Sequence, residues 1–212
     1  LRDLDEYYIS PLHNKDSKEF NLLSVSQKAK IFACISSLKA INETLLVDFG
    51  REPDITKVLT VLKRTAPFLK IYGAFINNYT ASVNALDKER SSNKKFKQYL
   101  ESARKRLQKA GKRFFDLNSY FILPVQRMPR YKILLQALVK YSTPEDEYYS
   151  LLTETTADIS AITSEINEKK RDIENQIRVA ELQTQHTIRL VAPHRRFIDE
   201  SLQFLKISKH GG

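Results

Sequence analysis

The sequence holds one cysteine, one methionine, five glycines and no tryptophan among its 212 residues. A single cysteine excludes a disulfide within the chain and fits a reducing compartment. Scarce glycine, together with abundant leucine, lysine, glutamate, glutamine and alanine, favours long helices over a sheet. No apolar run approaches the roughly 20 residues that cross a bilayer. The first residues, LRDLDEYY, carry charges that do not fit a signal peptide.

The formal net charge is +10, which attracts nucleic acid, anionic lipid or an acidic protein. Charge alone does not choose among these partners, and an ordinary solvated basic surface fits it equally well. The four histidines are scattered without metal-ligand spacing, and no phosphate-binding glycine loop occurs. We therefore expect no metal site, no cofactor and no conventional enzyme.

Apolar residues at three- and four-residue spacing predict six helices, each with an apolar stripe along one side. They are expected at residues 1–12, 24–49, 54–76, 93–110, 125–141 and from 145 past 180. The stripes of the first, fourth and sixth helices consist of Leu1, Leu4, Tyr8 and Leu12; of Phe96, Leu100, Ala103 and Leu107; and of Ile159, Ile162, Ile166, Ile173 and Ile177. Pro67 and Gly73 are expected to bend or interrupt the third helix. Cys34 is expected as a small buried thiol within the second helix.

Two further features follow from the pattern. The fifth helix has a wide apolar face typical of a helix central to a bundle, made of Ile133, Leu134, Leu135, Leu138 and Val139. After about Glu181 the pattern changes, because LQFLKIS alternates like a short strand and KHGG is typical of a turn. A domain boundary is therefore expected near residues 180–190.

Three segments carry a resemblance to a known family. Leu117 to Tyr141 reads LNSYFILPVQRMPRYKILLQALVKY, which closely resembles the third conserved region of Dbl-homology domains. Residues 162–171, ITSEINEKKR, resemble that family's last helix, and residues 7–12, YYISPL, resemble the end of its first helix. The resemblance covers about residues 1–180 and implies an all-α, elongated bundle of about six helices.

The tail resembles the start of a pleckstrin-homology domain, which usually follows a Dbl-homology domain. The matching phrase consists of Pro193, Arg195, Phe197, Ile198 and Glu200, followed by the expected strand. The expected organisation is thus a Dbl-homology domain at 1–180, its first helix truncated at the start. A linker and the first β-strand of a truncated pleckstrin-homology domain are expected at 181–212.

The resemblance implies a guanine-nucleotide exchange factor for Rho-family small GTPases. Such a protein promotes GDP release by stabilising the nucleotide-free GTPase, without covalent chemistry or a cofactor. Its effect rests on unequal affinity for two states of the partner, and the coupling is reciprocal. The resemblance also implies a cytoplasmic protein recruited to the membrane. It leaves open whether the partner is of the Rho, Rac or Cdc type.

The resemblance assigns contacts to particular residues. Arg130 matches a basic position of the fifth helix that reaches the GTPase switch region through charged hydrogen bonds. Asn167 matches the asparagine of the last helix that contacts the second switch region. Arg171, one turn further on, and its neighbour Lys170 are further predicted contacts. The alternative for Arg130 is an ion pair within the bundle. The alternative for Asn167 is a side chain hydrogen-bonded inside the bundle, at the edge of the apolar stripe. Lys170 and Arg171 could instead be solvated charges.

Two other matches complete the expectation. Gln126 and Arg127 match positions that look structural in the family. The glutamate that the family places on its first helix would lie about seven residues before Leu1, so weak exchange is expected of the sequence as printed. Arg195 and Arg196 are candidates for contact with anionic lipid or a phosphoinositide.

Two alternatives to exchange belong to other functional classes. A helical nucleic-acid binder would use clusters such as Arg104-Lys105-Arg106, but no zinc-finger, RNP or helix-turn-helix signature is present. A basic helical scaffold could instead bind anionic membrane without exchange activity. Vesicle binding without any effect on nucleotide release would indicate that scaffold.

Overall fold

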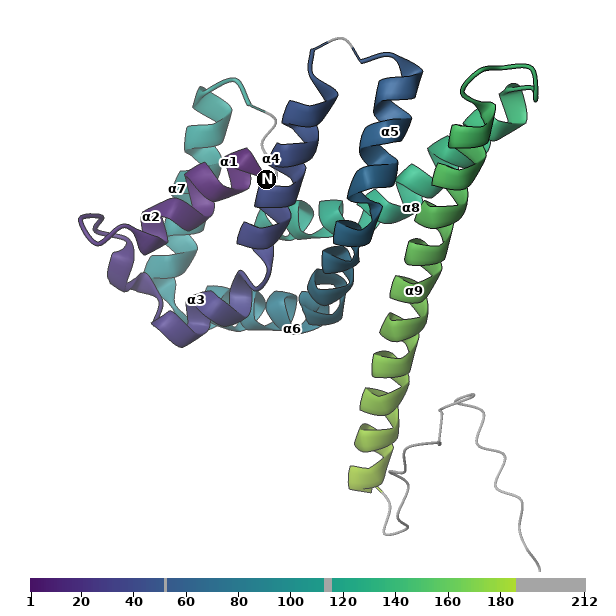
Figure 1. The fold of residues 1–212 in the computed structure, drawn as a ribbon. Coiled ribbons are helices and arrows are strands. Elements are labelled where there is room, and N and C mark those ends of the chain that lie inside the picture. Colours follow the sequence, from purple (N-terminus) through teal and green to yellow (C-terminus); the bar gives the residue numbers. More distant parts are fainter. Residues whose placement is uncertain (52, 113–115, 186–212) are drawn as a thin grey trace, which may run out of the picture. The chain divides into compact units, whose positions relative to one another are not determined.

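The computed structural model describes residues 1–51, 53–112 and 116–185, and every regular element in them is a helix. The all-α expectation is confirmed, and Figure 1 shows how the helices are arranged. The predicted strand and the pleckstrin-homology phrase lie outside the described residues. The chain divides into two compact units, Leu1–Lys169 and Lys170–Gly212. The predicted domain boundary near residue 180 stays a prediction.

The first predicted helix is present as three consecutive pieces. They are α1 (Arg2–Leu4), the π-helical turn η1 (Asp5–Ile9) and α2 (Ser10–His13). Leu4, Tyr8 and Leu12 are buried, which follows the predicted apolar stripe. This first helix therefore packs one side into the core of the first unit.

The second predicted helix is broken in two, so the expectation of one helix was wrong. A 3-10 turn, η2 (Phe20–Leu22), leads to α3 (Val25–Ile31), which Ser24 and Gln27 cap reciprocally. The next helix, α4, spans Ile35–Phe49. Cys34 separates α3 from α4 with a φ of 63°, a left-handed conformation that a regular right-handed helix does not contain. Cys34 is also half-buried rather than buried.

The third predicted helix is present as three consecutive elements. Asp54 caps α5 (Ile55–Thr65), the 3-10 turn η3 (Ala66–Lys70) holds Pro67, and α6 follows over Ile71–Ser92. The predicted interruption at Pro67 is confirmed, whereas the one at Gly73 is wrong. Gly73 is buried inside α6, where an added Cβ would lie 3.4 Å from Ile166 Cγ1. The small residue allows close packing of α6 against the last helix.

The fourth predicted helix is confirmed as α7 (Lys94–Lys109), capped by the Asn93 side chain. Its predicted stripe is buried at Phe96, Ala103 and Leu107. Tyr99 is also buried, and its hydroxyl bonds backbone carbonyls of the first helix. The opposite side of α7 is fully exposed.

The fifth helix, α8 (Leu117–Tyr141), begins eight residues before the predicted start and is capped by Asp116. Pro124 and Pro129 both lie inside it. A proline inside a helix costs about 3 kcal/mol or more, and aromatic packing of the first turns stabilises the helix against part of this cost. The ring of Tyr120 lies 5.8 Å from that of Tyr8, and the ring of Phe121 lies 6.2 Å from that of Phe32.

The sixth helix, α9 (Tyr149–Gln185), runs past Ala180 as predicted and begins four residues after the predicted start. Its part in the first unit forms ion pairs with two earlier elements. Glu154 pairs with Lys63 of α5, and Glu165 pairs with Lys70 of η3 at 3.1 Å. Ile159 and Ile166 of the predicted stripe are buried. No helix in the described ranges is both long and apolar enough to cross a membrane.

Candidate functional site

The second half of α8 turns one continuous face outward. Exposed residues recur on it at positions 126, 130, 133, 134, 137 and 141, a spacing that follows one side of a helix. Met128 and Leu135 occupy the opposite side and are buried. We call this exposed face the α8 stripe, defined by Gln126, Arg130, Ile133, Leu134, Ala137 and Tyr141.

The α8 stripe contradicts the predicted core position of this helix. Ile133 is 63% exposed, Leu134 62% and Leu138 39%, whereas Leu135 is 3% exposed. The bundle therefore buries only one side of the wide apolar face. Large apolar side chains gathered on a surface mark a contact site, because removing them from water is favourable by about 25 cal/mol for each Å², before the costs of association.

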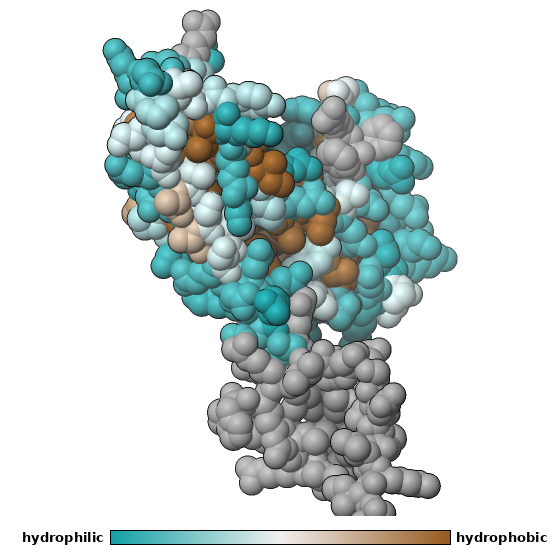
Figure 2. Space-filling view, turned by 90° about the vertical axis from the view of Figure 1, so that its right-hand side faces the viewer, coloured by the Kyte–Doolittle hydropathy of each residue, from teal (hydrophilic) through white to brown (hydrophobic). Residues whose placement is uncertain are grey.

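Hydrophobic side chains do reach the surface of the first unit among hydrophilic ones. Figure 2 shows them gathered in patches on the side turned toward the viewer. The most exposed large apolar residues of α8 are Ile133, Leu134 and Tyr141, all within its last three turns. The apolar part of the α8 stripe therefore lies just beyond Arg130 along the helix.

Arg130 is free to bind an external acceptor. It is exposed, and its Nη2 donates to Gln126 Oε1 of the same helix at 3.1 Å. Within the described ranges it makes no ion pair, so the alternative of a salt bridge inside the bundle is not observed there. A guanidinium in this state keeps several N–H donors for a carboxylate or carbonyl group.

Arg127, one turn before, is held on its own helix. Its Nε donates to the Tyr131 hydroxyl at 2.9 Å, and its guanidinium lies 4.9 Å from the centre of that ring. Both contacts orient the side chain along α8, which agrees with the structural part expected of Arg127. Arg127 is thus held by contacts within α8, whereas Arg130 keeps donors for a partner.

Asn167 lies on α9 and is exposed, directly after buried Ile166. In the described part of the chain its side-chain amide makes no hydrogen bond, so the alternative of an asparagine satisfied within the bundle is not observed there. Two residues earlier, hydrogen bonds from Lys169 and Lys70 lower the pKa of the Glu165 carboxyl. Lys169 Nζ lies 2.7 Å from Glu165 Oε1.

The remaining predicted contacts belong to other parts of the chain. Lys170 and Arg171 belong to the second unit, where Lys170 is half-buried and Arg171 exposed. Arg195 and Arg196 lie outside the described residues. No hydrogen bond or ion pair of the described residues joins Arg130 to Asn167. The assignment of all these residues stays a prediction.

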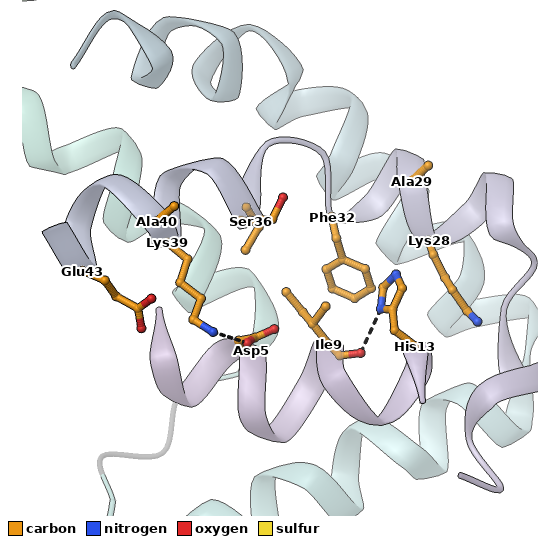
Figure 3. Close-up of a pocket in the computed structure, with 11 residues that line it drawn as sticks. Asp5, Ile9, His13, Lys28, Ala29, Phe32, Ser36, Lys39, Ala40 and Glu43 are labelled. Atoms are coloured by element: carbon orange, nitrogen blue, oxygen red, sulfur yellow. Dashed lines mark hydrogen bonds and ion pairs between the residues drawn. The ribbon is translucent and has the colours of Figure 1, made fainter. Parts of the chain in front are cut away.

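A cleft of about 560 Å³ lies elsewhere, between the first helix and the α3–α4 pair. Figure 3 shows the Lys39–Asp5 pair across it, at 2.5 Å, and His13 Nδ1 3.0 Å from the Ile9 carbonyl oxygen. None of the predicted site residues lines this cleft. In the described ranges no group of three or more His, Cys, Asp or Glu side chains could hold a metal ion.

Comparison with protein families decides what this bundle is. The model of the RhoGEF domain matches residues 1–167. The chain belongs to the RhoGEF domain family. The match spans both Arg130 and Asn167, and it ends before Lys170 and Arg171.

Curated relatives of the RhoGEF domain agree with this assignment. The Rac guanine nucleotide exchange factor JJ of Dictyostelium discoideum is 27% identical over 216 residues, covering 99% of this chain and 18% of that protein. The guanine exchange factor for Rac 30 of the same organism is 31% identical over 195 residues, covering 87% of this chain and 11% of that protein. The chain therefore spans less than a fifth of either relative.

A solved structure shares the fold. The apo structure of the activated truncation of Vav1 superposes with a TM-score of 0.76 at 20% identity, over 92% of this chain and 49% of that one. This likeness concerns the helical fold only. The Dbl-homology fold expected from the sequence is confirmed by it and by the family match.

Proposed function

We propose that this RhoGEF domain promotes GDP release from a Rho-family GTPase, and that the substrate is of the Rac type. The family match supports exchange, and the names of both curated relatives support Rac. The observation that carries the proposal is the α8 stripe, in which an exposed arginine without an ion pair in the described chain precedes exposed apolar residues. Neither the family match nor the named relatives support a membrane scaffold without exchange activity.

The physical basis is differential binding. The domain binds the nucleotide-free GTPase more tightly than the GDP-bound form, so it lowers the affinity of the GTPase for GDP by the same factor. GTP that enters the empty site weakens the grip of the domain in return. No covalent bond forms or breaks, so the chain acts as a catalyst of dissociation.

Each side chain has a distinct part in this proposal. Arg130 donates charged hydrogen bonds to carboxylate or carbonyl groups of a switch region. Ile133, Leu134 and Tyr141 supply apolar area next to it, an arrangement typical of a binding hot spot surrounded by polar groups. Asn167 donates and accepts hydrogen bonds through its side-chain amide at the second switch region. Arg171 and Lys170 add positive charge further along α9.

The proposal also includes recruitment of the chain to a membrane. Arg195 and Arg196 supply adjacent positive charges that suit an anionic headgroup or a phosphoinositide. Lipid contact there would place the exchange surface at a membrane without taking part in nucleotide release. The predicted start of a pleckstrin-homology domain is the reason for assigning this part to the tail.

The test is release of a fluorescent GDP analogue from purified Rac-, Rho- and Cdc-type GTPases in the presence of this chain. The expected result is faster release from the Rac type, together with a complex between the chain and the nucleotide-free GTPase in size-exclusion chromatography. A folded chain that neither accelerates release nor forms that complex with any GTPase would contradict the proposal. Faster release from another type alone would retain exchange and overturn the Rac assignment.

A further inference from the structure

The outer side of α7 concentrates the positive charge of the molecule. The helix carries seven basic residues and one acidic residue, a net charge of +6 against +10 for the whole chain. Its apolar residues face the bundle, so the charged ones cover the exposed side. We call this exposed side the α7 face, defined by Lys94, Lys95, Lys97, Lys105 and Lys109.

The lysines of the α7 face have no acidic partner in the described chain. Other basic residues nearby are paired, such as Lys112 with Asp3 at 3.3 Å and Arg90 with Asp87 at 2.8 Å. Arg106 is likewise occupied, since its Nη2 donates to the Tyr7 carbonyl and its guanidinium lies over the Tyr99 ring. The α7 face therefore carries charge that the fold itself does not use.

We propose that the α7 face docks the domain on an anionic lipid bilayer. A regular helix of 16 residues is about 24 Å long, so its lysines present an extended row to a planar surface. Each Lys near an anionic membrane adds about 1 kcal/mol of attraction, which is close to a fivefold gain in binding. This surface is separate from the exchange site proposed above and does not depend on it.

The chemistry of α7 fits a bilayer better than a nucleic acid. Its two aromatic residues, Phe96 and Tyr99, are buried, so no ring of this helix is exposed for stacking on bases. Insertion into the bilayer is also excluded for α7, because its apolar side is already packed against the bundle. The contact is therefore electrostatic and weakens as salt is added.

The position of α7 leaves the proposed exchange surface accessible. In the first unit, α7 and the beginning of α9 lie at opposite edges of the bundle (Figure 1). Helices α4, α5 and α6 lie between them in the same view. A membrane against the α7 face would therefore not cover the α8–α9 side.

Sedimentation with vesicles tests the proposal on the whole chain. The vesicles contain phosphatidylcholine alone or with about a third of phosphatidylserine, and binding is expected only with the anionic lipid. The variant Lys94→Gln/Lys105→Gln/Lys109→Gln should need roughly 100-fold more anionic lipid for half-binding, from three fivefold losses. Circular dichroism checks that the exposed substitutions leave the fold intact.

A matched variant removes the same charge elsewhere. Lys30, Lys57 and Lys140 are exposed on α3, α5 and α8, and Lys30→Gln/Lys57→Gln/Lys140→Gln should bind vesicles like the unaltered chain. Equal losses in the two triple variants would show that net charge alone matters and would overturn the α7 face as a docking surface.

A third arm separates the α7 face from the tail. If Arg195→Gln/Arg196→Gln abolishes vesicle binding while the α7 variant retains it, the docking surface lies in the tail and the present inference is wrong. Binding of a single-stranded RNA oligonucleotide is measured for the unaltered chain and for the α7 variant. Tight RNA binding that the α7 variant loses, without any vesicle binding by the unaltered chain, would assign the face to nucleic acid instead.

Discussion

The Tyr99 hydroxyl lies 3.0 Å from the carbonyl oxygen of Tyr7, in the π-helical turn of the first helix. Residue 11, four positions after Tyr7, is a proline without an amide hydrogen, so the usual helical donor to this carbonyl is missing. The same hydroxyl lies 2.9 Å from the Tyr8 carbonyl oxygen. A side chain of α7 therefore bonds a backbone carbonyl of the first helix that lacks its usual helical donor.

The first prediction concerns Tyr99→Phe. Removing the hydroxyl takes one donor from the carbonyls of Tyr7 and Tyr8 and leaves Arg106 bonded to the first, so the free energy of unfolding should fall by about 0.5–1.5 kcal/mol. Urea denaturation followed by circular dichroism measures it. Tyr141→Phe is the control, because Tyr141 is 83% exposed and should tolerate the change. Equal stability of the Tyr99→Phe variant and the unaltered chain would contradict this reading of the π turn.

The second prediction compares the two arginines of α8. Arg130→Ala should weaken the complex with the nucleotide-free GTPase roughly tenfold or more, since a charged hydrogen bond contributes about 1.5–3 kcal/mol. Its melting temperature should not change, because only Gln126 bonds it within the described chain. Arg127→Ala should instead lower the melting temperature by removing the contact with Tyr131. If Arg127→Ala weakened the complex and Arg130→Ala lowered the melting temperature, the roles assigned to the two arginines would be wrong.

The third prediction uses two neighbouring leucines of α8. Leu135→Ala should lower the free energy of unfolding by about 2–5 kcal/mol, because Leu135 is buried. Leu134→Ala should leave it within about 0.5 kcal/mol and weaken GTPase binding. Calorimetry of unfolding and of binding separates the two effects. Full GTPase affinity in the Leu134→Ala variant would remove the apolar part of the α8 stripe from the site.

The fourth prediction concerns alkaline pH. Burial raises the pKa of Tyr72 from its ordinary value of 10.0 to about 12. Between these values the folded chain holds a proton that the unfolded chain has lost, so stability falls as pH rises from about 10 to about 12. Its hydroxyl accepts from Asn42 Nδ2 at 2.8 Å, which joins α4 to α6.

The measurement is the free energy of unfolding across this pH range for the unaltered chain and for Tyr72→Phe. The variant should be less stable at neutral pH and should lose less stability per pH unit above 10. Burial also raises the pKa of Tyr8 to about 12, so part of the slope should remain. Identical slopes in the two proteins would show that Tyr72 ionises without hindrance in the folded state.

Local sequence signals predicted the helices best where caps and periodicity agree. Asp54 and Asn93 cap helices close to the expected starts, and α7 follows its stripe throughout. The start of α8 was missed, because Pro124 is typical of the first turn of a helix while the packing of Tyr120 and Phe121 is a tertiary effect. Cys34 was misplaced for a similar reason, since no glycine or proline marks its left-handed turn.

The candidate site residues come from the family motif, and their assignment stays a prediction. The family motif named Arg130 and Asn167, and both turn out to be exposed in the structure. The apolar periodicity of α8, in contrast, placed Ile133 and Leu134 in the core. A helix with apolar residues on two sides can bury only the side that faces its own bundle, and periodicity does not tell which side that is. The excess apolar width of this helix was the signal that could have indicated a binding surface.

The most direct test of exchange through the α8 stripe and α9 is the rate of GDP-analogue release from a Rac-type GTPase. The proteins compared are the unaltered chain, Arg130→Ala/Asn167→Ala and the control Lys57→Ala on α5. The double variant is expected to accelerate release roughly 100-fold less, from about 3 kcal/mol of lost contacts. Its melting temperature and the rate of the Lys57→Ala control should be unchanged. Release by the double variant at the rate of the unaltered chain would show that exchange does not pass through these side chains.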